Sequence, residues 1–239
     1  NPVVKLNNFE VEFVSLVHSV PQSSGLIIRT RYGNILHATD WRFDDGKTTI
    51  LPTDYPALQK ASAEGIALYV GDSTNMSDMS VEPSEYEVRE NLIKLVPTLR
   101  NTVVATCFAS NIMRLESLIL AAEAAGRTAV ISGHSLNQNY RIARECGYLQ
   151  NCPQAHDIKE AKDIPLDDVL YICAGSQGDY RSALSRIANG ESKDISLGKG
   201  DNIIFSSKII PGNEEKIERM QEKLRDAGVE VISCLLYTS

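Results

Sequence analysis

The chain has 239 residues, 43% of them hydrophobic, which is enough to bury the core of one large domain or of two small ones. Its formal net charge of −7 at pH 7 argues against binding of nucleic acid through a broad basic surface, so positive charge for that purpose would have to be local or supplied by metal ions. No apolar run approaches the about 20 residues of a membrane span, so we expect no membrane partner.

The first third of the sequence is typical of antiparallel β structure. Residues 11–14 alternate apolar and polar side chains, and residues 25–30 form a run rich in β-branched side chains. Residues 31–34 include a glycine and an asparagine, which tolerate the positive φ of a tight turn, and residues 35–38 follow as a returning strand. We therefore expect a two-stranded hairpin within residues 18–40.

From about residue 84 the pattern changes to strands that alternate with helices. Before this change, residues 68–70 predict a further short, buried strand that ends at Gly71. After it, strands are expected at residues 102–106, 128–132, 169–173, 202–206 and 229–232.

Two amphipathic helices are expected between these strands, at residues 111–125 and 213–227, and each is closed by the glycine that follows it. The first helix has an apolar stripe formed by Ile112, Leu115, Ile119 and Ala122. Its charged residues fall outside that stripe: Arg114, Glu116 and Glu123. Strand–helix–strand units of this length predict parallel pairing with right-handed crossovers, and therefore an α/β domain with an open, doubly wound sheet.

The sequence thus predicts two architectures, a β-rich part at residues 1–80 and an α/β domain at residues 81–233, with a polar linker near residues 78–87. The chain begins at Asn1 without a methionine, and we expect it to be an internal piece of a longer protein. Residues 234–239 resemble the translation of a sequencing adapter and are excluded from the expected fold; a genuine apolar tail is the alternative.

The five cysteines are odd in number and include no CxxC pair. This pattern indicates reduced thiols in a cytoplasmic protein. We expect them to be small apolar side chains that fill space in the core.

A histidine and an aspartate lie where expected strands end. His18 lies where a strand breaks before a proline, and Asp40 ends the returning strand of the hairpin. Adjacent antiparallel strands can bring such residues together, and a histidine with a carboxylate suits zinc or manganese. Because a metal site needs at least three protein ligands, the two residues alone leave structural hydrogen bonding open as the alternative.

Several ordered blocks of sequence resemble the ribonuclease J family across residues 11–233. The blocks are HSVPQS at 18–23, GNILHATD at 33–40, GDSTN at 71–75, ATCFASN at 105–111, GSQGD at 175–179, ALSRIANG at 183–190, FSS at 205–207 and IPGN at 210–213. The resemblance implies part of a metallo-β-lactamase αββα sandwich, followed by a doubly wound parallel-sheet beta-CASP domain.

The resemblance also implies catalytic roles for three residues. His18 and Asp40 match metal-binding motifs of the family, and Asp40 is the aspartate that bridges two Zn²⁺ ions, with Mn²⁺ as the alternative metal. Asp72 matches a carboxylate that orients a catalytic histidine. The family's His-x-His-x-Asp-His motif is absent from the sequence, so this fragment is expected to be inactive alone.

Candidate substrate-binding residues follow two of the expected strands: His134, Ser135, Gly175, Ser176, Gln177 and Gly178. Backbone N–H groups of a glycine-rich turn after a parallel strand can point at an anion, and the resemblance makes this turn a candidate for holding the RNA backbone or a terminal 5′ phosphate. The alternatives are a tight turn and a loop histidine without a role in binding. Arg114, Arg181 and Arg186 could add positive charge or be ordinary solvated residues. The sequence shows no interleaving of aromatic and basic residues from which stacking of single-stranded RNA could be predicted.

The resemblance implies a cytoplasmic ribonuclease of RNA processing and decay, including rRNA. It would hydrolyse single-stranded, 5′-monophosphorylated RNA from the 5′ end and also internally, and its full-length form would be a homo-oligomer. Two alternatives stay open at this point. One is a metallo-β-lactamase-fold hydrolase of small esters, and the other is a non-catalytic RNA-binding relative.

Overall fold

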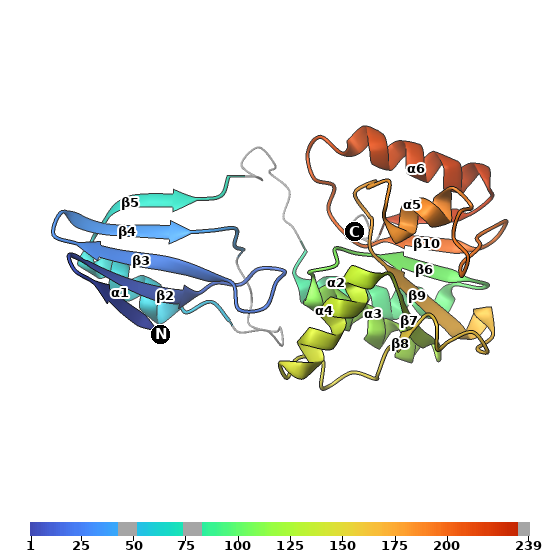
Figure 1. Ribbon diagram of the computed structural model, residues 1–239, viewed down its shortest axis with the longest axis horizontal. Coiled ribbons are helices and arrows are strands. Elements are labelled where there is room, and N and C mark those ends of the chain that lie inside the picture. Colours follow the sequence, from blue (N-terminus) through green and yellow to red (C-terminus); the bar gives the residue numbers. More distant parts are fainter. Residues whose placement is uncertain (43–51, 74–82, 234–239) are drawn as a thin grey trace. The chain divides into compact units, whose positions relative to one another are not determined.

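The computed structural model describes residues 1–42, 52–73 and 83–233. The chain divides into two compact units, Asn1–Ser84 (unit 1) and Glu85–Ser239 (unit 2) (Figure 1). The expected tail at residues 234–239 lies outside the described residues, as does most of the expected linker. Helix α2 begins at Glu85, within the stretch expected to be linker.

Unit 1 is built on one five-stranded sheet whose strands lie in chain order. All neighbouring strands pair antiparallel except the last two, which are parallel, so the predicted hairpin is confirmed. The strands are β1 (Val3–Leu6), β2 (Phe9–Ser15), β3 (Ser24–Thr30), β4 (Gly33–Ala38) and β5 (Ile66–Gly71).

The two faces of this sheet are covered unequally. On one face, Val14 and Ile27 are fully buried and pack with Ala61 of helix α1 (Tyr55–Glu64). The strand register places the alternate residues on the opposite face, where apolar side chains reach 55% exposure at Leu6. We call this the open face; its apolar residues are Val4, Leu6, Phe9, Val11, Phe13, Leu26, Ile28, Ile35, Leu68 and Val70.

Strand β5 exists as expected, but the expectation that it is buried was wrong. Leu68, Tyr69 and Val70 are 51%, 52% and 41% exposed. β5 is an edge strand with a partner on one side only, and Leu68 and Val70 belong to the open face. An apolar run therefore identified the strand correctly, whereas burial depends on what packs against it.

Helix α1 is fixed at its start by Asp54. The Asp54 carboxylate accepts a hydrogen bond from the backbone N–H of Ala57 at 3.0 Å, and Pro56 lies in the first turn. This bond, together with a second from the Asn1 amide at 2.9 Å, holds the pKa of Asp54 below its usual value.

Replacing Asp54 with alanine is expected to lower the free energy of unfolding of unit 1 by about 1 kcal/mol near neutral pH. Because the folded pKa is lowered, this stabilisation is present above the unfolded pKa of about 3.9 and is lost as the pH falls through the folded value. Urea unfolding at about pH 7 and about pH 3, followed by the fluorescence of Trp41, the only tryptophan, measures the difference. Asp54→Asn, which keeps the capping bond but not the charge, is the control. An Asp54→Ala deficit that is equal at both pH values would contradict the role of the charge.

Unit 2 contains a six-stranded sheet in which every pairing is parallel, as predicted. Five of its strands lie where the sequence placed them, and the short edge strand β8 was not expected. In spatial order the strands are β11 (Glu230–Ser233), β10 (Asn202–Phe205), β6 (Val103–Thr106), β9 (Val169–Cys173), β7 (Thr128–Ser132) and β8 (His156–Asp157).

Helices cover both faces of the unit 2 sheet, as a doubly wound fold requires (Figure 1). One core lies under α2 (Glu85–Leu95), α3 (Ile112–Ala124) and α4 (His134–Glu145). The other lies under α5 (Ala183–Ala188) and α6 (Glu214–Asp226). Two short 3₁₀ turns complete the unit, η1 (Val96–Thr98) and η2 (Leu166–Asp168). No helix in the described ranges is long and apolar enough to cross a membrane.

Helix α3 matches the expected helix, with Asn111 as its N-cap, but two of its charged residues are buried. Arg114 is 5% exposed and Glu116 is 3% exposed. The expectation that Arg114 is either solvated or available to substrate was therefore wrong. The reason is that α2, which was not expected, contributes an opposite charge to each residue, Glu85 to Arg114 and Arg89 to Glu116.

Candidate functional site

The carboxyl ends of β6 and β9 form the topological switch point of the unit 2 sheet. From β6 the chain passes through α3 to β7, which lies on one side, whereas from β9 it passes through α5 to β10, on the other. The loops after these two strands therefore turn to opposite faces of the sheet. The crevice between such loops is where open α/β sheets bind ligands.

A cavity of about 470 Å³ lies at this switch point, and we call it the switch-point pocket. It is lined by residues from the segments 107–109, 133–135 and 174–186, which follow β6, β7 and β9 respectively. This volume is in the range of small-molecule sites. The structure brings five of the six predicted substrate-binding residues into the pocket lining: His134, Ser135, Gly175, Ser176 and Gln177.

His134 and Ser135 lie at the start of helix α4 rather than in a loop. The N-cap residue is Gly133, which has no side chain to cap the N–H groups of the first turn. Because Gly133, His134 and Ser135 all line the pocket, the positive end of the helix dipole is directed toward it. This arrangement favours an anion in the pocket.

The turn after β9 requires its glycines. Gly175 has φ +119°, and a Cβ atom there would overlap the side chain of Ser182. Gly178 has φ +78°, and a Cβ atom there would lie 2.8 Å from the Cβ of Lys216. Gly178 belongs to the turn but does not line the pocket. Its role is therefore to allow the backbone conformation of the turn and not to contact a ligand.

The side chain of Gln177 is occupied by the loop between β10 and α6. Its Nε2 donates to the carbonyl oxygen of Lys208 at 2.9 Å, and its Oε1 accepts from the N–H of Ile210, also at 2.9 Å. Gln177 therefore ties this loop to the pocket wall, which makes it a positioning residue.

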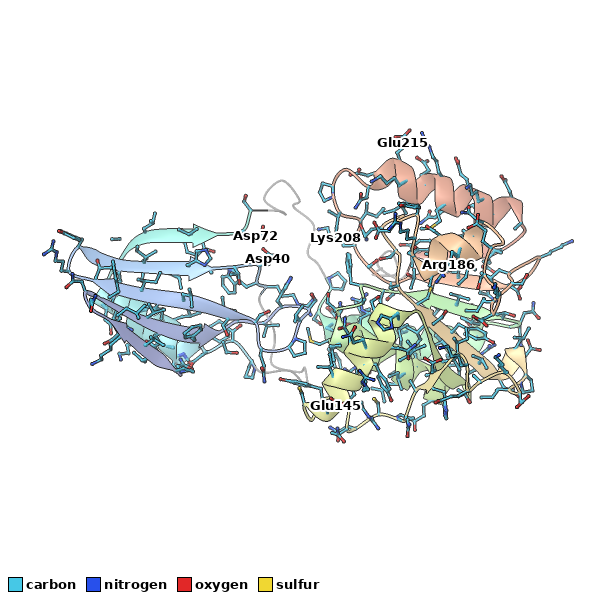
Figure 2. All side chains as sticks on the ribbon, viewed as in Figure 1. Asp40, Asp72, Glu145, Arg186, Lys208 and Glu215 are labelled. Carbon is cyan, nitrogen blue, oxygen red and sulfur yellow. The ribbon has the colours of Figure 1, made fainter. Side chains whose placement is uncertain are left out.

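Two arginines bring positive charge to the pocket. Arg181 precedes helix α5 and Arg186 lies within it, and both side chains are exposed and line the cavity (Figure 2 labels Arg186). Asp179 contributes the opposite charge from the same loop. Of the three arginines considered from the sequence, Arg181 and Arg186 thus reach the pocket, and Arg114 is bound to Glu85.

Cys107 lines the pocket but is not suited to act as a nucleophile. Its side chain is fully buried, and this burial raises the pKa of the Cys107 thiol to about 12. The thiol is therefore protonated near neutral pH. The neighbouring Cys173 has its pKa raised to about 12 for the same reason.

In unit 1, three strands end at the same edge of the sheet. β2 and β4 are both antiparallel to β3, and β5 is parallel to β4, so β2, β4 and β5 run in one direction. His18 follows β2, Asp40 follows β4 and Asp72 follows β5. Figure 2 shows Asp40 and Asp72 at this edge.

The structure brings His18 and Asp40 together. His18 Nε2 and Asp40 Oδ2 are 4.0 Å apart, and the side chains are 36% and 71% exposed. This separation exceeds a hydrogen bond. Among the described residues, no group of three or more histidine, cysteine, aspartate or glutamate side chains could hold a metal ion, so His18 and Asp40 form at most part of such a site.

Comparison with known proteins identifies the unit 2 sequence. The family model "Ribonuclease J, beta-CASP domain" matches residues 100–224. The chain is 36% identical to a ribonuclease J of Sinorhizobium meliloti, with 96% of this chain and 41% of that protein covered. It is 38% identical to the ribonuclease J of Mycolicibacterium smegmatis, with 94% and 40% covered. The chain therefore spans about two fifths of the length of these relatives.

A solved structure shares the fold over nearly the whole chain. It is the crystal structure of a protein of unknown function from Enterococcus faecalis V583, which matches with a TM-score of 0.65 at 15% identity. The match covers 98% of this chain and 54% of the other. At this identity the likeness concerns the fold alone.

Proposed function

The chain belongs to the ribonuclease J family, and from that premise we propose that it is part of a metal-dependent ribonuclease that cuts single-stranded RNA from the 5′ end and also internally. The observation that carries this proposal is the clustering of an uncapped helix start, a glycine turn and two arginines around the switch-point pocket. The parent protein would act in the cytoplasm, where reduced thiols such as those of Cys107, Cys152 and Cys173 persist. Its assembly into homo-oligomers stays a prediction.

The pocket suits a terminal phosphate better than a neutral ligand. A phosphate has several acceptor oxygens and up to two negative charges, which match the N–H groups at the start of α4 and the guanidinium groups of Arg181 and Arg186. A 5′-monophosphorylated end would thus be held more tightly than a 5′-hydroxyl end. Ser135 and Ser176 also line the pocket, and their hydroxyl groups can donate to the same phosphate.

The open face of unit 1 supports its assignment to a metallo-β-lactamase sandwich. An apolar sheet face of this extent is unusual for a surface that stays exposed to solvent. In a sandwich, a second sheet would cover this face. We propose that further sequence of the parent protein covers it. Helix α1, which covers the other face, would then be one of the outer helices of the αββα arrangement.

The donor groups of His18 and Asp40 fit a Zn²⁺ or Mn²⁺ site. In tetrahedral geometry, ligand atoms at about 2.0–2.2 Å from one ion are about 3.3–3.6 Å apart. The two side chains, 4.0 Å apart, would need to approach by a few tenths of an ångström to share one ion. Two such ions, when bound, supply Lewis acidity and lower the pKa of water. His18 would coordinate through Nε2. The Asp40 carboxylate has two oxygens and a negative charge, which suit a position between two cations.

Asp72 would orient a catalytic histidine rather than bind a metal ion. A carboxylate that accepts a hydrogen bond from one ring nitrogen of a histidine fixes its tautomer and raises its basicity. Asp72 lies at the same sheet edge as His18 and Asp40, which supports this role for a histidine from elsewhere in the parent protein.

Replacing Arg186 with glutamine is expected to weaken binding of a 5′-monophosphorylated single-stranded oligoribonucleotide at least about tenfold, because one charge-assisted hydrogen bond contributes about 1.5–3 kcal/mol. Binding of the same oligonucleotide with a 5′-hydroxyl end should change little. Fluorescence anisotropy on the 239-residue chain measures both affinities.

The matched control is Arg219→Gln, which removes an exposed arginine that pairs with Glu215 on α6. This variant should bind both oligonucleotides with the affinity of the unmodified chain. Equal losses for the two oligonucleotides in Arg186→Gln, or no loss for either, would contradict a phosphate role for the pocket.

A further inference from the structure

We infer that Tyr180 is a stacking platform for the first nucleobase of an RNA whose 5′ phosphate occupies the switch-point pocket. This inference rests on the proposed function and adds a base-binding subsite to it. Tyr180 lies between Asp179 and Arg181, and both neighbours line the pocket. Tyr180 is 74% exposed and does not itself line the pocket, so it lies beside the pocket rather than inside it.

The Tyr180 ring is held by its neighbour. The guanidinium carbon of Arg181 lies 5.1 Å from the ring centroid, and Arg181 Nε donates a hydrogen bond to the tyrosine hydroxyl. A cation over one face of an aromatic ring is attracted by its quadrupole. Because Tyr180 is 74% exposed, most of its surface stays accessible to a ligand.

A nucleobase is the ligand class that suits this position. Single-stranded RNA is commonly bound by stacking of bases on tyrosine rings and on guanidinium planes, beside cationic groups that hold the backbone. Arg181 belongs to both parts of this arrangement, because it lines the anion pocket and also contacts the ring. A phosphate and the base of the same nucleotide are separated only by one sugar, so neighbouring residues can bind the two groups.

Tyr32 provides an internal comparison. It is 80% exposed, and the guanidinium of Arg31 lies 4.5 Å from its ring centroid, so the local geometry resembles that of Tyr180. Tyr32 lies in the turn between β3 and β4 of unit 1. The pocket beside Tyr180 is what distinguishes the two tyrosines, and Tyr32→Ala is therefore a matched control.

The test uses the 239-residue chain and a 5′-monophosphorylated oligoribonucleotide that carries 2-aminopurine as its first base. Stacking on tyrosine is expected to quench the 2-aminopurine fluorescence when the chain binds. Tyr180→Ala should abolish the quenching and weaken binding about tenfold, the range expected for one stacked base. Tyr180→Phe should retain both effects, and Tyr32→Ala should behave like the unmodified chain. Circular dichroism checks that each variant is folded.

A second oligonucleotide separates the stacking proposal from the phosphate pocket. It keeps the 5′ phosphate but has an abasic first nucleotide. It should bind equally to the unmodified chain and to the Tyr180→Ala variant. Phosphate-dependent binding without quenching, or with no effect of Tyr180→Ala, would overturn the stacking proposal and leave the pocket in place. Binding that does not depend on the 5′ phosphate would overturn the proposed pocket, and the stacking proposal with it.

Discussion

Replacing Arg114 with methionine is expected to lower the free energy of unfolding of unit 2 by about 3–5 kcal/mol. Arg114 is buried, and its Nε and Nη2 donate to the two carboxylate oxygens of Glu85 at 2.6 and 3.1 Å. Its Nη1 donates to the backbone carbonyl and to the hydroxyl of Ser206. Methionine fills similar space but leaves Glu85, which is 2% exposed, without the guanidinium that balances its charge. Urea unfolding followed by far-ultraviolet circular dichroism measures the change.

The double variant Arg114→Met, Glu85→Met separates the charge from the packing. Replacing both partners by apolar residues removes the carboxylate that Arg114 no longer balances, so most of the lost stability should return. The control Arg219→Met removes an exposed pair with Glu215 and should cost no more than about 0.5 kcal/mol. A double variant as unstable as the single variant would show that the loss comes from packing and not from the charge of Glu85.

This ion pair also shows what the sequence could not reveal about unit 2. The strand pattern identified five of the six parallel strands because buried parallel strands are continuous apolar runs. The apolar stripe of α3 was equally visible, but the place of Arg114 depends on α2. Its Glu85 lies in the stretch expected to be polar linker, and its Arg89 lies just after that stretch. The burial of a charged residue depends on its tertiary partner, and the hydrophobic periodicity of its own helix contains no information about that partner.

The candidate site in unit 2 was predictable to a similar extent. A glycine turn after a parallel strand is a local feature with a local cause, and its place at the switch point follows from the strand order. The role of Gln177 was not predictable, because its partners Lys208 and Ile210 lie in a loop that follows a different strand. Tyr180 was not singled out because one aromatic beside one arginine shows no interleaved pattern. Its meaning depends on the pocket beside it.

The candidate metal-binding residues of unit 1 were predictable mainly from motifs and not from the hydrophobic pattern. His18, Asp40 and Asp72 are far apart in sequence. Each lies within three residues of the end of a strand, and the directions of the strands bring them to one end of the sheet. The strand pattern placed His18 and Asp40 at strand ends, but only the motif resemblance singled out Asp72 and assigned a role to each of the three. Their catalytic roles stay predictions that only the parent protein can test.

Replacing Asp40 with asparagine is expected to lower the ribonuclease activity of the parent protein, extended to the length of its relatives, by about a thousandfold. Asparagine keeps the shape of the side chain but removes the negative charge and one of the two anionic oxygens that would coordinate two cations. The loss of several kcal/mol of stabilisation by metal corresponds to about three powers of ten in rate. Hydrolysis of a 5′-monophosphorylated RNA measures the activity, and the metal content of the purified protein is measured in parallel.

Asp226→Asn, an exposed substitution near the end of α6, is the matched control and should leave both the activity and the metal content unchanged. A parent protein that binds RNA but shows no hydrolysis with either Zn²⁺ or Mn²⁺ would favour the non-catalytic RNA-binding alternative. Full activity in Asp40→Asn would contradict the metal role of this residue while leaving the phosphate pocket of unit 2 intact. The two sites lie in separate units, so the two measurements, metal content for Asp40 and phosphate-dependent binding for Arg186, test them independently.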